Sequence, residues 1–216
     1  MKIGTKSLLF GVHQFIVHPV VVGRAWRALY GRWPNLNEWI AIVVHDWGYW
    51  GLPNMDGPEG QLHPSRSAKV AFFVGKWAWK LKNLFRPAVR DTPGADIHYG
   101  LRCAMMVLLH SREMVRLTRE QFGDLSVNPS TLCWPDKYSV CFESKWFYLL
   151  RARLSGEIHE FRANAVKSGK VSPESSAGDW LDWYRSYIYR LPDVARLRRQ
   201  QDMQKFHAWL LRGNLR

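Results

Sequence analysis

An apolar run that ends in an adjacent histidine and aspartate constrains this chain more than any other feature. Residues 39–44 read Trp-Ile-Ala-Ile-Val-Val, and His45 and Asp46 follow directly. Such a run becomes buried when the chain folds, and burying the two polar side chains at its end without partners costs free energy. A bound metal ion is a partner that satisfies an imidazole and a carboxylate together. The alternative is a capped helix end in which the two side chains bond to each other.

Other histidines and one more aspartate extend this pattern over more than half of the chain. The candidate metal ligands, in order, are His18, His45, Asp46, His63, His110 and Asp136. Imidazole and carboxylate groups without thiolates select borderline or hard divalent ions, so Fe, Mn, Co, Zn and Mg are all candidates. His13 competes with His18 for the first place. Each ligand also has a structural interpretation, as a core imidazole, a loop residue or, for Asp136, a surface ion pair.

Helical patterns account for almost the whole chain. Leu8–Tyr30 reads as one helix, or as two helices that meet near Pro19. Ile97–Leu117 carries apolar residues at helical spacing, and a further helix runs from about Asn128 to Arg153. Alternating β-branched runs bounded by turn residues are missing. We therefore predict an all-α fold.

The composition divides the chain into two parts. Residues 1–167 form the predicted helical domain, and residues 168–216 form a Ser/Gly/Pro-rich linker and a basic, amphipathic helical extension that packs on the same domain. Between the candidate ligands, residues 52–61 are dense in Pro, Gly, Asn and Asp. A loop of that composition beside a site is a good place for substrate contacts.

The chain is basic, with 31 Lys and Arg against 18 Asp and Glu, a net charge of +13. Such a charge attracts the phosphates of nucleotides, nucleic acids or lipid headgroups. The three cysteines form no close pair, which excludes a zinc ribbon or a disulfide scaffold and fits a reducing, cytoplasmic location. The apolar stretch Leu8–Trp26 contains His13, His18 and Arg24, which are costly in hydrocarbon, so we expect no membrane span.

Three short motifs resemble those of the HD-domain metal-dependent phosphohydrolases. Residues 18–25 (His-Pro-Val-Val-Val-Gly-Arg-Ala) look like the first motif of that family. Residues 44–49 (Val-His-Asp-Trp-Gly-Tyr) resemble the central motif, and residues 133–139 (Cys-Trp-Pro-Asp-Lys-Tyr-Ser) resemble the last. His63 and His110 stand where the two-metal branch of the family has the ligands of its second ion. The resemblance implies an HD-like helical bundle.

The resemblance also implies a function and a division of the ligands. His18, His45, Asp46 and Asp136 would hold one ion, and His63 and His110 would complete a second site, with the Asp46 carboxylate bridging. If those two histidines are not ligands, the site holds one ion. Two ions about 3.5–4 Å apart clamp a phosphate and lower the pKa of a shared water, which then attacks phosphorus. The implied activity is phosphoester or phosphoanhydride hydrolysis in a nucleoside phosphate, dinucleoside polyphosphate or cyclic nucleotide, with His45 and Asp46 as catalytic candidates.

Several charged residues near the proposed ligands are candidates for contact with the substrate. Those for binding the phosphate are Arg66, Lys69, Arg112 and Lys137. A guanidinium group suits a pair of phosphate oxygens geometrically. Asp56 and Glu59, in the loop, are candidates for the general acid. The competing interpretation of each residue is solvated surface charge.

A function of another class depends on the basic C-terminal segment. In this alternative the chain is a non-catalytic HD-like module that binds nucleic acid or an acidic membrane surface. The residues behind it are Arg185, Arg190, Arg196, Arg198, Arg199 and Lys205. Such binding would weaken steeply with salt and would survive removal of metal.

Overall fold

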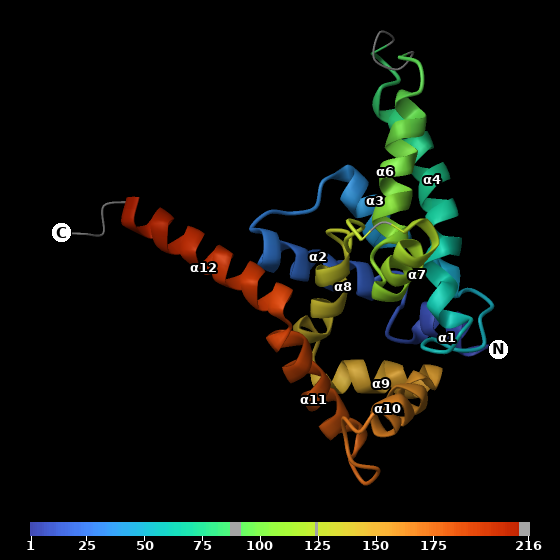
Figure 1. Cartoon of the computed structure of the whole chain (residues 1–216), viewed down its shortest axis with the longest axis vertical. Helices are drawn as coiled ribbons and strands as arrows, with labels where there is room; N and C mark the ends of the chain where they lie inside the picture. Colours follow the sequence, from blue (N-terminus) through green and yellow to red (C-terminus); the bar gives the residue numbers. More distant parts are fainter. Residues whose placement is uncertain (87–91, 124, 212–216) are drawn as a thin grey trace.

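The computed structural model describes residues 1–86, 92–123 and 125–211, and within these ranges the backbone forms helices and loops but no strand. The all-α prediction is confirmed for this part of the chain. In chain order (Figure 1), the α-helices are α1 (Ile3–Phe10), α2 (Val17–Tyr30), α3 (Leu36–Val44), α4 (His63–Lys82), α6 (Ala95–Leu108), α7 (Arg112–Phe122), α8 (Cys133–Tyr138), α9 (Lys145–Ser155), α10 (Glu157–Lys167), α11 (Ala177–Arg190) and α12 (Pro192–Leu211). Short 3₁₀ helices lie between them at η1 (Trp47–Tyr49), η2 (Gly60–Leu62) and η3 (Ser139–Phe142).

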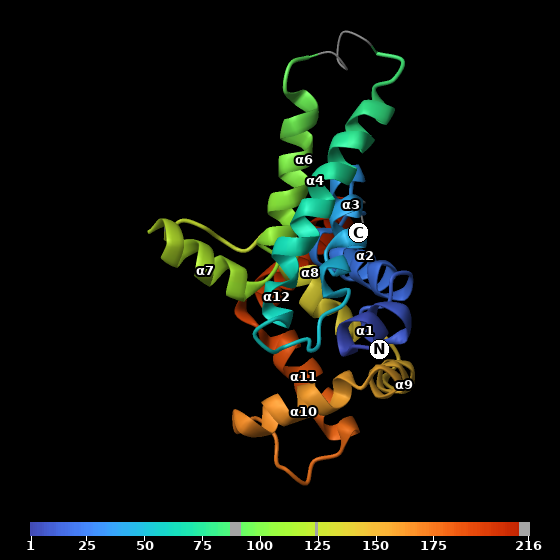
Figure 2. The ribbon, with the colours of Figure 1, turned by 90° about the vertical axis from the view of Figure 1, so that its right-hand side faces the viewer.

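Helices α4 and α6 lie side by side and antiparallel, and they project from the rest of the molecule as a long hairpin (Figures 1 and 2). Small residues allow their backbones to approach closely. A Cβ atom added at Gly75 would lie 2.9 Å from Cys103 Sγ, and one at Gly100 would lie 2.7 Å from the carbonyl oxygen of Phe72. Because the helices are antiparallel, the start of α4 and the end of α6 meet at the base of the hairpin.

Two of the long helices predicted from periodicity are interrupted at a histidine-bearing segment. Residues 11–16 separate α1 from α2, and Pro19 is the third residue of α2, in the first turn, where proline is tolerated. Residues 109–111 separate α6 from α7, because the side chain of Ser111 caps α7 by accepting a bond from the backbone N–H of Met114. Histidine side chains therefore lie at helix ends, where several helices can meet.

The predicted helix from Asn128 to about Arg153 also divides, into α8, η3 and α9. Ser144 starts α9 with a cap in which its side chain accepts a bond from the backbone N–H of Phe147. The apolar stretch Leu8–Trp26 is likewise shared between two short helices. Among the helices of the described ranges, none is both long and apolar enough to cross a bilayer.

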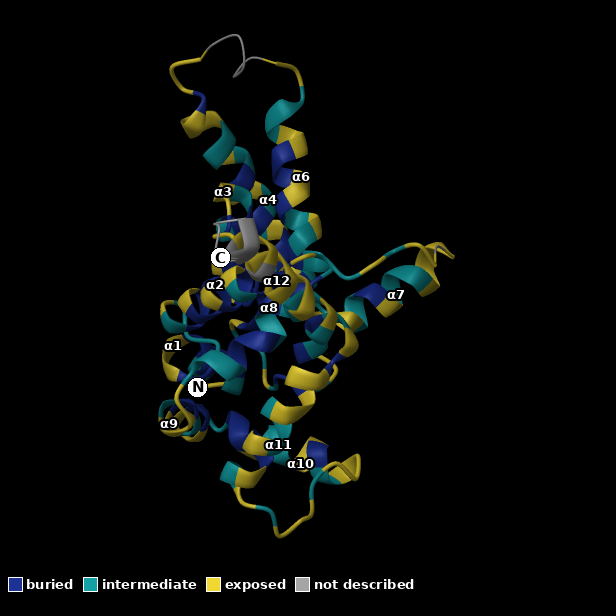
Figure 3. Cartoon of the chain, turned by 90° about the vertical axis from the view of Figure 1, so that its left-hand side faces the viewer, coloured by how far each residue is buried: buried dark blue, intermediate teal, exposed yellow. Residues whose placement is uncertain are grey.

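The C-terminal helices share an apolar cluster with the N-terminal part of the chain. Leu29 of α2 packs in one cluster with Trp180 and Ile188 of α11 and Val194 of α12. Helix α11 is amphipathic, as predicted. In α12, residues 202–205 are exposed (Figure 3).

Candidate metal centre

The ends of several helices converge on one cluster of polar side chains. His18 is the second residue of α2, His45 and Asp46 directly follow α3, and His63 is the first residue of α4. His110 lies two residues after the end of α6, and Asp136 is part of α8. Five of the six predicted ligands are buried and Asp136 is half-buried. The structure thus brings all six together from segments that are far apart in the sequence.

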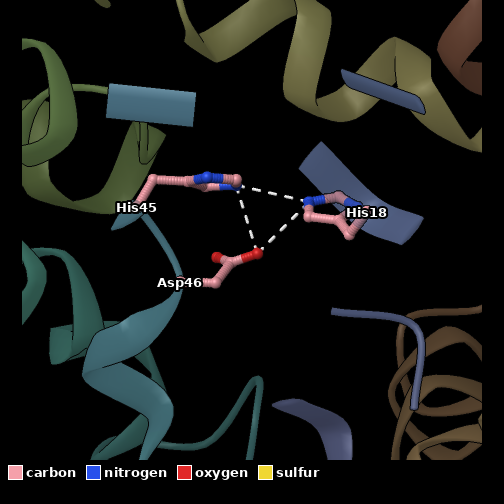
Figure 4. Close-up of side chains that lie close together, drawn as sticks. All are labelled: His18, His45 and Asp46. Atoms are coloured by element: carbon pink, nitrogen blue, oxygen red, sulfur yellow. Dashed lines mark hydrogen bonds and ion pairs between the residues drawn. The ribbon is translucent and has the colours of Figure 1, made fainter. Parts of the chain in front are cut away.

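We call one group of donors the first half of the centre. It consists of His18, His45, Asp136 and the Oδ2 atom of Asp46. His18 Nε2 lies 3.2 Å from Asp46 Oδ2 and 3.2 Å from Asp136 Oδ1. His45 Nε2 lies 3.1 Å and 3.3 Å from the same two oxygens. The two imidazole nitrogens are 3.3 Å apart. Figure 4 shows His18, His45 and Asp46 pointing toward one another, so their donor atoms surround a common point.

The second half of the centre consists of His63, His110 and the Oδ1 atom of Asp46. His63 Nε2 lies 3.5 Å from Asp46 Oδ1 and 3.3 Å from His110 Nε2. The ring of Tyr49 stacks on that of His63 with centroids 3.8 Å apart, which fixes the plane of the imidazole. Asp46 therefore turns one carboxylate oxygen to each half, which is the arrangement a bridging ligand requires.

Backbone carbonyl groups orient three of the imidazoles in the same way. The Nδ1 atoms of His45 and His63 donate to the carbonyl oxygens of the residues three positions earlier, at 2.8 Å and 2.7 Å. His110 makes the same bond to Val107. A proton on Nδ1 leaves the lone pair of Nε2 directed into the centre, as in metal sites whose histidines bond to carbonyl groups through the other nitrogen.

The pKa of His45, in the first half, shifts in the opposite direction from the pKa values of His63 and His110, in the second half. Burial by itself would lower the pKa of His45, but the neighbouring carboxylates of Asp46 and Asp136 outweigh it and raise that pKa well above 6.5. Burial is the largest cause that lowers the pKa of His63 well below 6.5 and that of His110 to about 4, and nearby imidazoles add to it. His45 thus attracts a proton, whereas His63 and His110 exclude one.

The carboxylates of the centre stay ionised although they are shielded from water. The pKa values of Asp46 and Asp136 lie well below 3.8, because the imidazoles stabilise the charged forms by more than burial disfavours them. Asp46 Oδ2 is fully buried and has no hydrogen-bond partner within the described residues. The imidazoles of His18 and His45 lie at hydrogen-bonding distance from this oxygen, but their geometry is not that of a hydrogen bond. Such an atom needs positive charge beside it.

The donor set fits a metal ion. In the second half, His63 and His110 both donate from Nδ1, so two unprotonated Nε2 atoms face each other at 3.3 Å. Their lone pairs repel unless a cation is shared between them. The buried His and Asp groups of the described chain can therefore hold a metal ion. Nitrogen and oxygen donors without thiolate fit the set of ions expected from the sequence.

His13, the competitor of His18, lies next to the centre but outside it. Its Nδ1 donates to Glu157 Oε1 at 2.8 Å, and its ring meets that of His18 edge-on with centroids 5.3 Å apart. Glu157 is fully buried and also accepts bonds from Ser7 Oγ and the backbone N–H of Val12. This carboxylate holds the loop between α1 and α2 so that His18, and not His13, reaches the centre.

A cavity of about 240 Å³, here called the metal cavity, opens beside the centre. Two of the four predicted phosphate-binding residues, Arg112 and Lys137, line it together with Asp46, His63, His110 and Asp136. Arg66 and Lys69 do not line it. Helix α4 buries Ser67 and Ala68 against its neighbours and leaves Arg66 and Lys69 exposed on its other side.

The predicted loop at residues 52–61 is tied to α10 by Glu160. The carboxylate of Glu160 accepts hydrogen bonds of 2.8–3.1 Å from the backbone N–H groups of residues 55–57. Asp56 lines the metal cavity, whereas Glu59 does not line it and accepts a bond from an asparagine of the same loop. Of the two candidate acids, Asp56 is the one beside the centre.

Gly48 has a steric role in the central motif. A Cβ atom at this position would lie 2.0 Å from the carbonyl oxygen of His63, and the backbone N–H of Gly48 donates to Ser67 Oγ at 2.7 Å. The start of α4 can approach the His-Asp pair only because position 48 has no side chain.

Three supporting residues were not predicted from the sequence. They are Tyr49, which stacks on His63, and Glu157 and Glu160, which hold the two loops. The two glutamates lie in the first turn of α10, more than 100 residues from the backbone groups that they bind, so no local pattern marks them. Tyr49 had a weak signal, its place next to Gly48 in the central motif.

No family model matches the chain, and neither a curated protein nor a solved structure was found to match it.

Proposed function

We propose that the chain is a metal-dependent phosphohydrolase of the HD type, which cleaves a phosphoester or phosphoanhydride bond of a nucleotide. One observation carries the proposal: two sets of His and Asp donors share Asp46 beside a cavity lined by Arg112 and Lys137. The order of the ligands along the chain and the adjacency of His45 and Asp46 are those of the HD motifs. The all-α architecture agrees with the helical bundle of that family.

In this proposal the first half holds one divalent ion and the second half holds another. Ions in such a pair clamp a phosphate and lower the pKa of water so that it can attack phosphorus. The contribution of the chain is to orient the donors. Asp46 and Asp136 are ionised, and the carbonyl bonds to His45, His63 and His110 keep their Nε2 atoms directed inward.

Arg112 and Lys137 are the residues placed to bind the substrate phosphate. Arg112 is the first residue of α7, Lys137 follows Asp136 in α8, and both line the metal cavity. A guanidinium group binds two phosphate oxygens at once, whereas an ammonium group acts as a point charge. Together they offset the negative charge of a phosphate that lies against the two carboxylates. Nucleoside phosphates, dinucleoside polyphosphates and cyclic nucleotides all present such a group.

The test measures phosphate release from a panel of nucleotides by protein loaded with each candidate divalent ion. We expect release that stops on chelation, returns when metal is added back, and is lost in Asp46→Asn. The matched control is Asp182→Asn, since Asp182 is an exposed carboxylate of α11 that pairs with Lys145. Full turnover of chelated protein, or of Asp46→Asn, would contradict the proposal.

The non-catalytic alternative has less structural support. Four of the six basic residues behind it have partners within the chain: Arg185 donates to backbone carbonyls, Arg198 lies over the Tyr189 ring, and Arg196 and Lys205 pair with aspartates of α12. The two aspartates offset part of the charge that the segment presents to a polyanion, and the contacts of Arg185 and Arg198 hold their side chains against the protein. Binding to DNA or anionic vesicles that persists after chelation and falls with salt would favour this alternative.

A further inference from the structure

A second cavity, also of about 240 Å³, adjoins the metal cavity and has no part in the reaction proposed above. The two cavities share His13, Tyr49 and Asp56 as lining residues, so they are neighbouring parts of one cleft. The rest of the second cavity is mainly aromatic. Its aromatic lining from α9, α10 and α11 consists of Tyr148, Phe161, Trp180, Trp183, Tyr184 and Tyr187. We call it the aromatic cavity.

The aromatic rings of this cavity are held nearly parallel. The Trp180 ring stacks on Phe161 and on Tyr184, with centroids 5.6 Å and 5.4 Å away and interplanar angles of 15° and 11°. Trp183 and Tyr187 form a second stack, 5.7 Å apart and inclined by 14°. Trp180 is buried, Trp183 and Tyr184 are half-buried, and Tyr187 is exposed. Rings already ordered in this way can accept a planar group at little cost in conformational entropy.

We propose that the aromatic cavity binds the base of a nucleoside phosphate whose phosphate group lies in the metal cavity. This inference rests on the function proposed above, and it assigns the part of the cleft that holds the base of the nucleotide. Stacking on aromatic side chains accepts any base, because every base has a π face. The shared lining residues place the base and the phosphate of one molecule in adjoining parts of the cleft.

Polar groups at the same cavity suit the edge of a base. Asn164 offers an amide that both donates and accepts, and Ser168 offers a hydroxyl group. The Lys170 ammonium lies 6.0 Å from the centre of the Tyr187 ring. A volume of about 240 Å³ is below the roughly 300–1,000 Å³ of pockets that enclose drug-sized ligands. One ring system fits this space better than a peptide or an acyl chain.

The first experiment measures calorimetric binding of free nucleosides (adenosine, guanosine, cytidine and uridine), with ribose as the base-free reference. Nucleosides carry no phosphate, so their binding tests the aromatic cavity separately from hydrolysis. We expect at least one nucleoside to bind and ribose not to bind. Loss of one stacking ring in Trp183→Ala should weaken binding roughly tenfold to a hundredfold. Trp146→Ala, which removes an exposed tryptophan of α9 outside the cavity, should bind like the wild type.

Tyr187→Ala is the second variant, because Tyr187 is 39% exposed and its loss disturbs packing least. It should weaken nucleoside binding while the melting temperature stays near that of the wild type. If no nucleoside binds the wild type, or if both variants bind as the wild type does, the inference is overturned.

The second experiment compares phosphate release from nucleoside monophosphates with release from ribose 5-phosphate. We expect Trp183→Ala to raise KM for the nucleotides and to leave hydrolysis of ribose 5-phosphate unchanged. If the wild type had equal KM values for nucleoside monophosphates and ribose 5-phosphate, the proposed base site would be wrong, whereas the proposed phosphohydrolase activity would be supported. Nucleoside binding that depends on Trp183, in a protein that hydrolyses no phosphate compound, would support the base site and overturn the proposed function.

Discussion

The two halves of the metal centre use the same residue types but differ in the ratio of carboxylate to imidazole. The first half has His18 and His45 with two carboxylates, whereas the second half has His63 and His110 with one oxygen of the shared Asp46. The pKa of the first half's His45 is raised, and those of His63 and His110 are lowered, the last to about 4. The ratio of carboxylates to imidazoles in each half therefore decides whether an imidazole there binds a proton readily or stays neutral.

If each half holds an ion, as we propose, this difference gives the two halves distinct metal chemistry. A metal ion that enters the first half has to displace a proton from His45, but it meets two negative charges there. An ion that enters the second half meets imidazoles that are already neutral, but only one carboxylate oxygen. Asp46 belongs to both halves, so we expect the two ions to depend on one residue and otherwise to respond separately to substitution.

The largest effect should come from Asp46→Asn, which removes the shared charge. We expect both ions to be lost and the rate of phosphate release to fall by on the order of 10³-fold, as when a main electrostatic contact of a reaction is removed. Elemental analysis of the dialysed protein gives the metal content. If the variant retained two ions per chain, Asp46 would not be a ligand that bridges them.

The next largest effect separates the halves. His110→Ala should release the second ion and keep the first, whereas His45→Ala should release the first. The expected metal content of each variant is about half that of the wild type. His98→Ala is the control, because His98 is exposed on α6 and outside the centre. Identical loss of all metal from both variants would mean that the halves act as one site.

The pH dependence of metal binding should also differ between the halves. Because the pKa of His45 is raised, protons compete with the first ion already near neutral pH, and its apparent affinity should fall tenfold per pH unit below that pKa. The pKa of His110 is about 4, so protons compete for that ligand of the second half only in stronger acid. Equilibrium dialysis from pH 8 to pH 4 should show metal content falling in two steps. A single step would contradict the comparison.

The smallest effect should follow Gly48→Ala, in which the new Cβ atom pushes against the carbonyl group of His63. We expect a loss of about 2 kcal/mol in the free energy of unfolding, typical of overpacking. We also expect a weaker second ion, because the start of α4 must move. Gly178→Ala is the control, since the atoms nearest to its Cβ atom would be side-chain atoms of Lys145 and Ser176 at 3.2–3.4 Å, and none of them belongs to the backbone. Urea unfolding measures the loss of stability, and metal titration measures the affinity for the second ion. An unchanged affinity would show that Gly48 does not affect the metal centre.

Local sequence signals were sufficient for the fold class and for the identity of the clustered residues. Helical periodicity and the lack of strand patterns predicted an all-α chain, and the structure agrees in the part that it describes. The apolar run before His45 and Asp46 required buried partners: His45 has them in Ile42 and Asp136, whereas Asp46 Oδ2 has no hydrogen-bond partner within the described residues. Each of these signals depends on residues within one helix or at its ends.

The tertiary structure alone decided which of several similar residues reach the centre. His18 was chosen over His13 by a loop that Glu157 holds from α10. Arg112 and Lys137 reach the metal cavity and the other two predicted cations do not, because the buried face of α4 excludes them. Four of the six aromatic side chains of the aromatic cavity come from α11, which lies in the predicted C-terminal extension and not in the predicted domain of the candidate site. Contacts between residues so far apart depend on how helices pack, which periodicity within one helix cannot specify.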